Sequence, residues 1–171
     1  MVHLRVCKQK EDIELYTHYM LSNKARLHPG MDHRLMFLLL SAQFQHGEML
    51  IALNEDHRVV GAAGYCYGTA DQHFANKETV MVDRVYLDED RRGSRLFVQG
   101  LQVLAGLLEQ SPVQVTNIQF YIPEQDMRLC RLCDRFANRV LKLRTPAGVD
   151  VLYLATPESL SSYSRTLVGS P

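Results

Sequence analysis

Apolar positions along the middle of this chain follow first a strand pattern and then a helix pattern. Val80–Leu87 is rich in β-branched residues, which is typical of a strand. Four apolar residues follow at spacings of four, three and four, on one face of a helix: Phe97, Leu101, Leu104 and Leu108. The centre of the chain is therefore predicted to run from a strand, through a short polar segment, into an amphipathic helix.

The same two periodicities predict elements on both sides of this centre. Strands are predicted at 3–8, 49–53, 58–68, 114–122, 139–144 and 150–155, and helices at 11–27, 33–45 and 125–140. Gly61 and Gly64 suggest a bulge or a close backbone approach within strand 58–68. We expect an antiparallel meander of three consecutive strands, followed by a right-handed strand–helix–strand crossover. The Ser-rich tail, 157–171, is predicted to be a short helix or a loosely held end.

Composition limits the classes of protein that fit this pattern. A chain of 171 residues with 46% apolar residues can form a single domain over residues 1–171. With 19 basic and 19 acidic residues the formal net charge is zero, which argues against nucleic-acid or anionic-membrane partners. The longest apolar run, Leu35–Leu40, is too short to span a bilayer, and the N-terminus lacks the apolar region of a signal peptide. Four irregularly spaced cysteines favour reduced thiols, so we expect a cytoplasmic protein.

The polar segment Asp88–Ser94 is a candidate anion site. The first N–H groups of the helix that follows have no intrahelical partner, and the helix dipole adds about half a positive charge there. Gly93 allows a ligand to approach the backbone closely, and Ser94 is a plausible N-cap. Together with the guanidinium groups of Arg91, Arg92 and Arg95, these donors favour a phosphate or pyrophosphate. The alternative is an ordinary strand–helix turn whose arginines are neutralised by the three preceding acidic residues.

The stretch RVYLDEDRRGSRLF resembles motif A of the GNAT superfamily of N-acetyltransferases, with Arg92 and Gly93 at the Arg-Gly of that motif. A second stretch, PEQDMRLCRLCDRFAN, resembles a later helix of the family. This sequence departs from the family at several positions: Arg95 and Phe97 stand where motif A has glycines, Asp126 at a usual Asn, and Cys133 at a usual Tyr. A register shifted by two residues would align Gly93 with a motif glycine, but the first register keeps Arg-Gly and a natural strand length.

The resemblance implies an α/β (α+β) fold with a mixed, mostly antiparallel twisted sheet of six to seven strands, flanked by about four helices. It also implies transfer of an acetyl group from acetyl-CoA to an amine, on a small molecule or a peptide, by direct attack in a ternary complex. The pyrophosphate would bind N–H groups of the Arg92–Leu96 segment, and the pantetheine arm would pair with the β-strand backbone. The residues that it assigns to acetyl-CoA are Val85, Tyr86, Leu87, Arg91, Arg92, Gly93, Ser94, Arg95, Leu96 and Asp126.

The main candidates for the proton transfers that this reaction needs are Asp83, Tyr121 and Cys133, and further candidates are Tyr86 as an acid and Glu78 and His73 as bases. Asp83 lies in the central strand and could accept the proton of the attacking amine, or could be a structural ion-pair partner. Strict alternation places it on the same sheet face as Val85 and Leu87. Tyr121 could protonate the leaving thiolate, as could Cys133 at the position of the family's Tyr; the alternative for each is a packing residue, which is the more common role of a strand Tyr or a helix Cys. No cluster has metal-ligand spacing, so no metal is expected.

Two rival functions remain open from the sequence. One is a catalytically weak or inactive module of the same fold that binds CoA or another phosphorylated ligand, which the departures at Arg95, Phe97 and Cys133 favour. The other is a protein-binding domain that uses the apolar helix around Leu35–Leu40. A homodimer is possible. We expect the acceptor surface to come from residues 11–45, the loop 69–77 and the closing hairpin.

Overall fold

The computed structural model describes residues 2–27, 30–92, 95–146 and 148–168. The chain divides into two compact units, one of residues 1–67 and 82–96, and the other of residues 68–81 and 97–171. Seven strands form a sheet in the order β1-β2-β3-β4-β5-β7-β6, and β4 (Thr79–Leu87) runs from the second unit into the first. The predicted mixed α/β class and the strand number are thereby confirmed.

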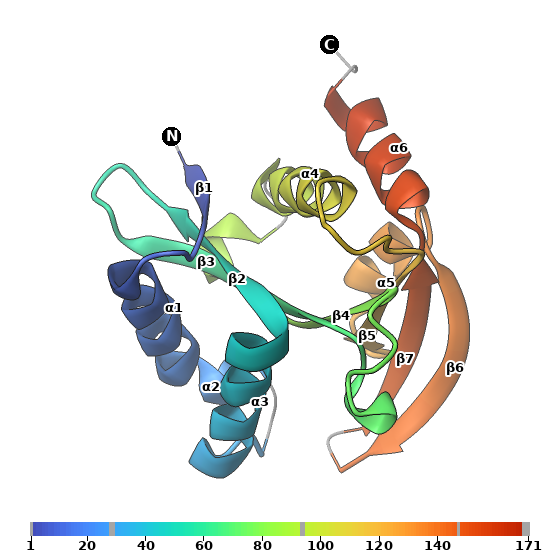
Figure 1. The fold of residues 1–171 in the computed structure, drawn as a ribbon, viewed down its shortest axis with the longest axis horizontal. Coiled ribbons are helices and arrows are strands. Elements are labelled where there is room, and N and C mark those ends of the chain that lie inside the picture. Colours follow the sequence, from blue (N-terminus) through green and yellow to red (C-terminus); the bar gives the residue numbers. More distant parts are fainter. Residues whose placement is uncertain (1, 28–29, 93–94, 147, 169–171) are drawn as a thin grey trace. The chain divides into compact units, whose positions relative to one another are not determined.

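The first unit packs helices against an antiparallel meander (Figure 1). Its elements are β1 (His3–Val6), α1 (Lys10–Ser22), α2 (Lys24–Leu27), α3 (His33–His46), β2 (Gly47–Leu53) and β3 (Val59–Tyr67). Side chains of β2 alternate between two apolar clusters. Ile51 and Leu53 join the cluster formed with α1 and α3, whereas Ala52 points the other way and packs with Val60 and Leu96.

The predicted close approach at Gly64 is present in this unit. A Cβ at Gly64 would overlap the Nε2 atom of Gln43 and the hydroxyl of Tyr16, which donates a 2.8 Å hydrogen bond to Gln43 Oε1. The predicted irregularity is also found, because the β2–β3 register shifts between Ala52 and Leu53, beside Gly61. Glycine at position 64 thus lets α1 and α3 lie directly on β3.

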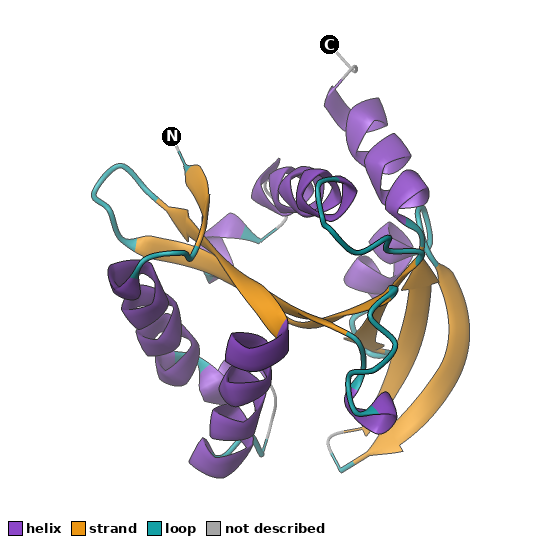
Figure 2. Ribbon diagram, in the orientation of Figure 1, coloured by secondary structure: helices purple, strands orange, loops and turns teal. Residues whose placement is uncertain are grey.

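The second unit combines antiparallel strands with three helices (Figure 2). Its elements are most of α4 (Arg95–Glu109), β5 (Asn117–Pro123), α5 (Met127–Cys133), β6 (Asn138–Thr145), β7 (Gly148–Ala155) and α6 (Pro157–Val168). β7 pairs antiparallel with β5 on one side and with β6 on the other, so β6 is the edge strand. The Ser-rich tail is thus a helix from Pro157 to Val168.

Two helix boundaries differ from the sequence prediction. The helix predicted over 125–140 ends at Cys133, because the carbonyl of Cys133 accepts from the N–H groups of Phe136 and Ala137 and the chain turns into β6. The helix predicted over 11–27 is interrupted at Asn23, whose backbone N–H and side-chain amide both donate to Tyr19 O. The described chain consequently contains six α-helices, where about four were expected.

Candidate functional site

The end of β4 in the first unit carries the basic segment that motif A predicted. Tyr86 is buried, while Val85 is 45% exposed and Leu87 packs beside the Val60 cluster. After Leu87 the chain forms a 3-10 turn, Glu89–Arg91. The N–H of Asp88 donates to Val60 O at 3.0 Å, which fixes the start of this turn against β3.

Arg92 folds back over the end of the strand. Its Nε atom donates to Leu87 O at 3.2 Å, and its guanidinium carbon lies 5.3 Å from the centre of the Tyr86 ring. Neither partner is a carboxylate, so these contacts orient the guanidinium group without cancelling its charge. Arg92 is therefore a positioned and exposed cation at the point where β4 ends.

The three acidic residues before Arg92 each contact another side chain. Asp88 Oδ1 accepts from the hydroxyl of Tyr19 at 2.7 Å, Glu89 lies 3.5 Å from Arg26 Nη1, and Asp90 lies 3.2 Å from Arg91 Nε. Arg91 is thus the arginine that the turn neutralises, as the plain strand–helix interpretation expects. Within the part of the chain that the structure describes, no carboxylate pairs with Arg92 in this way.

Helix α4 begins directly after this segment. Arg95 is its first residue and is exposed, whereas Leu96 is 5% exposed and packs with Ala52 and Val60. The buried Leu96 anchors the first turn of α4, and the N–H groups in the first turn of a helix point towards its N-terminal end. Gly93 and Ser94, the predicted close-approach and N-cap residues, lie outside the described residues.

Asp83 lies on a different face of β4 from the one that strict alternation predicts. Its Oδ2 atom accepts from the Cys66 thiol, with a sulfur–oxygen distance of 3.2 Å, and the carboxylate helps to raise the pKa of Tyr16 on α1. Asp83 therefore shares the α1–α3 face with Tyr86, whose ring packs on Tyr19 at 5.7 Å, and not the face of Leu87. Because Asp83 and Tyr86 are three residues apart, the alternation of β4 must be interrupted once between them.

The Asp83 carboxylate lies near a cluster of polar side chains between the sheet and the helices α1 and α3. Tyr16 is fully buried, and burial raises the pKa of its phenol so that it stays protonated and donates to Gln43. Cys66 is 1% exposed, whereas Asp83 is only partly buried. The Asp83 carboxylate, which can accept a proton, is thus held by the Cys66 thiol on the side of the sheet that α1 and α3 cover.

In the second unit, Tyr121 is accessible and Cys133 is not. Tyr121 lies in β5 with 40% of its surface exposed. Cys133 is 1% exposed, and burial, aided by the nearby Cys130 and Asp134, raises its thiol pKa to about 12. A thiol held so strongly in its protonated form is a weak acid, which favours the packing interpretation of Cys133.

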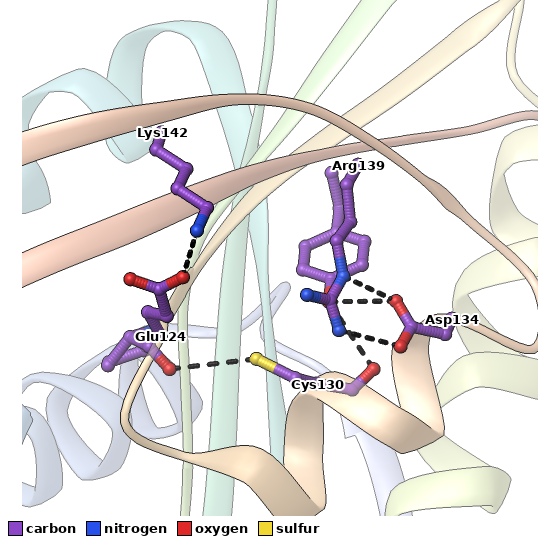
Figure 3. A network of polar contacts seen from close by, with 7 residues as sticks. Glu124, Cys130, Asp134, Arg139 and Lys142 are labelled. Atoms are coloured by element: carbon purple, nitrogen blue, oxygen red, sulfur yellow. Dashed lines mark hydrogen bonds and ion pairs between the residues drawn. The ribbon is translucent and has the colours of Figure 1, made fainter.

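Helix α5 is held to the edge hairpin by the polar network in Figure 3. Asp134 binds Arg139 through two 2.7 Å hydrogen bonds and accepts from the Tyr153 hydroxyl at 3.1 Å, while Glu124 pairs with Lys142. Asp126 caps α5, because its Oδ1 atom accepts from Leu129 N at 3.0 Å. The carboxylate that was expected to contact acetyl-CoA therefore has a structural partner in its own helix.

The sequence did not reveal the part that Tyr19 and Arg26 play in this region. Tyr19 donates to Asp88 across 69 positions of sequence, and Arg26 Nη1 donates to the Tyr86 hydroxyl at 3.4 Å. Both residues occur in a helical pattern that gives no sign of a distant partner. Only the packing of α1 and α2 beside the end of β4 brings them to the candidate site.

The described residues contain neither a candidate metal site nor a candidate membrane-spanning helix. No group of three or more His, Cys, Asp or Glu residues lies close enough together there to hold a metal ion. Among the same residues, no helix combines the length and the apolar character needed to cross a membrane.

Comparison with known proteins gives the same fold. No protein-family model matches the chain, and no curated protein matches it in sequence. Solved structures do match. The ribosomal-protein-S5-alanine acetyltransferase of Vibrio fischeri is 12% identical, with a TM-score of 0.68 over 92% of this chain and 93% of that one. The ribosomal-protein-S18-alanine N-acetyltransferase of Escherichia coli is 13% identical, with a TM-score of 0.68 over 91% and 94%.

A third similar structure contains a bound coenzyme. Aminoglycoside acetyltransferase AAC(6')-Ib, in complex with coenzyme A and kanamycin, is 17% identical, with a TM-score of 0.65 over 95% of this chain and 98% of that one. At such low identity the likeness establishes the fold alone. The chain has the fold of the GNAT acetyltransferases, so the sequence resemblance is confirmed at that level.

Proposed function

We propose that this chain is an N-acetyltransferase that transfers the acetyl group of acetyl-CoA to an amine by direct attack in a ternary complex. The observation that carries the proposal is the end of β4, where Arg92 is held in position, pairs with no carboxylate among the described residues, and lies three positions before the first residue of helix α4. This arrangement suits a diphosphate, because a guanidinium group and the N–H groups at a helix N-terminus are both donors to anionic oxygens. The same fold binds coenzyme A in the aminoglycoside enzyme, which supports the choice of ligand.

In the proposed binding mode, each residue of the segment has one task. Arg92 and Arg95 donate to the diphosphate together with N–H groups of the segment 92–96. The backbone of Val85 and Leu87 pairs with the pantetheine arm as an added strand does. Arg91 contributes less, since Asp90 already neutralises it. The Asp126 carboxylate acts mainly as the cap of α5.

The proposed chemistry requires two proton transfers. The nitrogen of a neutral amine attacks the thioester carbonyl, the carbon–sulfur bond breaks, and the amine proton must leave. Asp83 is the proposed acceptor of that proton, and the thiol of Cys66 holds its carboxylate in place. Tyr121 is the proposed donor to the departing thiolate, because it is exposed whereas Cys133 is buried.

Thiol release tests this proposal. With acetyl-CoA and a panel of primary amines, we expect amine-dependent release of free CoA and acetylation of the amine by mass spectrometry. Asp83→Asn should lower kcat by about a hundredfold, the usual contribution of a general base, while leaving the Kd for acetyl-CoA unchanged. Amine-independent release, or equal kcat values for the variant and the wild type, would contradict the assignment.

A second candidate function is a binding module that holds CoA without acetyl transfer. The observation that favours it is Cys133, which stands at the position of the family's Tyr but is buried with a pKa of about 12. Calorimetric binding of acetyl-CoA without thiol release for any amine would support this module over the enzyme.

A further inference from the structure

The sheet of the second unit has two faces of different chemical character. Residues paired directly across antiparallel strands point to the same face. Phe120, Tyr153 and Arg139 form one such row, which the 5.4 Å ring stacking of Phe120 on Tyr153 confirms. This row faces α5, since the Tyr153 hydroxyl donates to Cys130 O.

The neighbouring row points the opposite way. It consists of Tyr121, Leu152 and Leu141, and the next row on the same side consists of Pro123, Asp150 and Leu143. We call the surface formed by these six residues the Tyr121 face. Tyr121, Leu141 and Leu143 are 40%, 47% and 48% exposed, so this face presents apolar side chains to its surroundings.

Charge is divided unequally between the two faces of β6. The pairing with β7, whose register shifts between Arg139 and Leu141, places Arg139, Lys142 and Arg144 on the α5 face. There Asp134 and Glu124 neutralise the first two (Figure 3). The Tyr121 face carries Asp150, and within the described part of the chain no cation pairs with that carboxylate. The one formal charge among the six residues of the Tyr121 face is therefore the negative charge of Asp150.

We infer that the Tyr121 face binds the acceptor, and that the acceptor is an organic cation whose amine is attached to an apolar segment. This inference rests on the proposed function, in which Tyr121 protonates the leaving thiolate. The Asp150 carboxylate attracts the ammonium form of the amine, which releases one proton to water before the neutral amine attacks, and Leu141 and Leu143 bury its apolar segment. An anionic acceptor is disfavoured, because it would meet a carboxylate and the arginine and lysine side chains of β6 point to the other face.

Three amines test this selectivity with the intact chain. Hexylamine has a cationic head and an apolar tail, ethylamine lacks the tail, and ε-aminocaproate adds a carboxylate to it. We expect kcat/KM to be at least about tenfold higher for hexylamine than for either of the others, since each lost methylene contact or added like charge weakens binding.

Two variants locate the effect on the Tyr121 face. Asp150→Asn should raise the KM for hexylamine about tenfold, and Leu143→Asn about fivefold, with kcat and the KM for acetyl-CoA unchanged. Glu158→Gln removes an exposed carboxylate from α6 and is the matched control, which should change neither KM. Both test positions are accessible to solvent, so thermal unfolding should confirm that the variants remain folded.

The outcomes separate this inference from the proposed function. Acetyl transfer with no preference for hexylamine, or with KM values that both variants leave unchanged, overturns the inference and leaves the acetyltransferase intact. No transfer to any amine and no binding of acetyl-CoA overturns the proposed function, and the inference fails with it. Selective loss of hexylamine affinity in both variants supports the inference.

Discussion

Tyr19 shows how much one side chain contributes at the residue scale. Its hydroxyl donates to Asp88 at 2.7 Å, and its ring packs on Tyr86. Burial, followed by the contact with Asp88, raises the pKa of this phenol, so it remains a donor over the ordinary pH range. Helix α1 is thus bonded directly to Asp88, the first residue of the polar segment that follows β4.

Tyr19→Phe should therefore destabilise the first unit. It leaves a partly buried carboxylate without its donor, which costs about 1–3 kcal/mol of unfolding free energy. Urea denaturation measures the change. Tyr163→Phe, at a tyrosine whose ring contacts Phe136, is the control and should cost less. Equal costs for the two variants would show that the Tyr19–Asp88 bond contributes nothing.

Glycine substitutions offer a second test at this scale. Gly64→Ala should lose about 2 kcal/mol, because its methyl group would displace Gln43 or Tyr16 from their buried bond. Gly106→Ala is the matched control within α4, where a Cβ meets open space, and should gain about 0.5–1 kcal/mol from the better helix former. The Tm should fall for Gly64→Ala and rise for Gly106→Ala. A stable Gly64→Ala protein would contradict the close packing.

Asp134 predicts a pH dependence. Its pairing with Arg139 holds the pKa of this carboxyl below its ordinary value, so the stabilisation is present above the unfolded pKa of about 4 and is lost as pH falls through the lower folded value. Asp134→Asn should lower the Tm at pH 7, and the difference from the wild type should vanish when the Tm is measured at a pH below the lowered folded pKa. A difference of the same size at both pH values would contradict this sign.

At the element scale, periodicity predicted most of the fold correctly. Strand β4 appears where β-branched residues placed it, and helix α4 where helical spacing placed it, because Leu104 and Leu108 of that spacing are buried. The same rule failed after Cys133. Phe136 and Val140 continue the helical spacing by coincidence: Phe136 packs between Phe120 and Tyr163 from a turn, and Val140 is exposed in β6.

Long-range contacts could not be predicted from the sequence. Asp83 shares a face with Cys66, but the sequence of β4 is a run of apolar residues broken by two charged ones, and this pattern does not specify which face each residue takes. The Tyr19–Asp88 and Arg26–Tyr86 contacts also depend on packing between distant segments. The candidate site could be predicted as a segment of chain, whereas its partners could not.

The cap of helix α5 provides a prediction at this scale. Asp126→Ala should cost about 1 kcal/mol, the usual value of an N-cap, and Asp126→Ser should restore most of it. If Asp126 acts only as the cap, acetyl-CoA affinity should be the same in both variants. A weakened affinity in the Ser variant, with stability restored, would return Asp126 to the coenzyme site. Chemical denaturation and calorimetry provide the two measurements.

At the scale of the whole molecule, the fold is that of acetyltransferases while the sequence is only 12–17% identical to the three solved structures compared. Fold alone does not define an activity. The proposed activity therefore depends on the site, and within the site on the transition from β4 to α4. Arg92 is the described residue whose charge and orientation are most specific to an anionic ligand there.

Calorimetric titration with acetyl-CoA tests this transition most directly. The wild type should bind one equivalent, Arg92→Gln should bind at least about tenfold more weakly, and Arg144→Gln, an exposed arginine in β6, should bind as the wild type does. If the wild type binds no acetyl-CoA, or if Arg92→Gln binds it with unchanged affinity, the diphosphate does not bind where β4 ends.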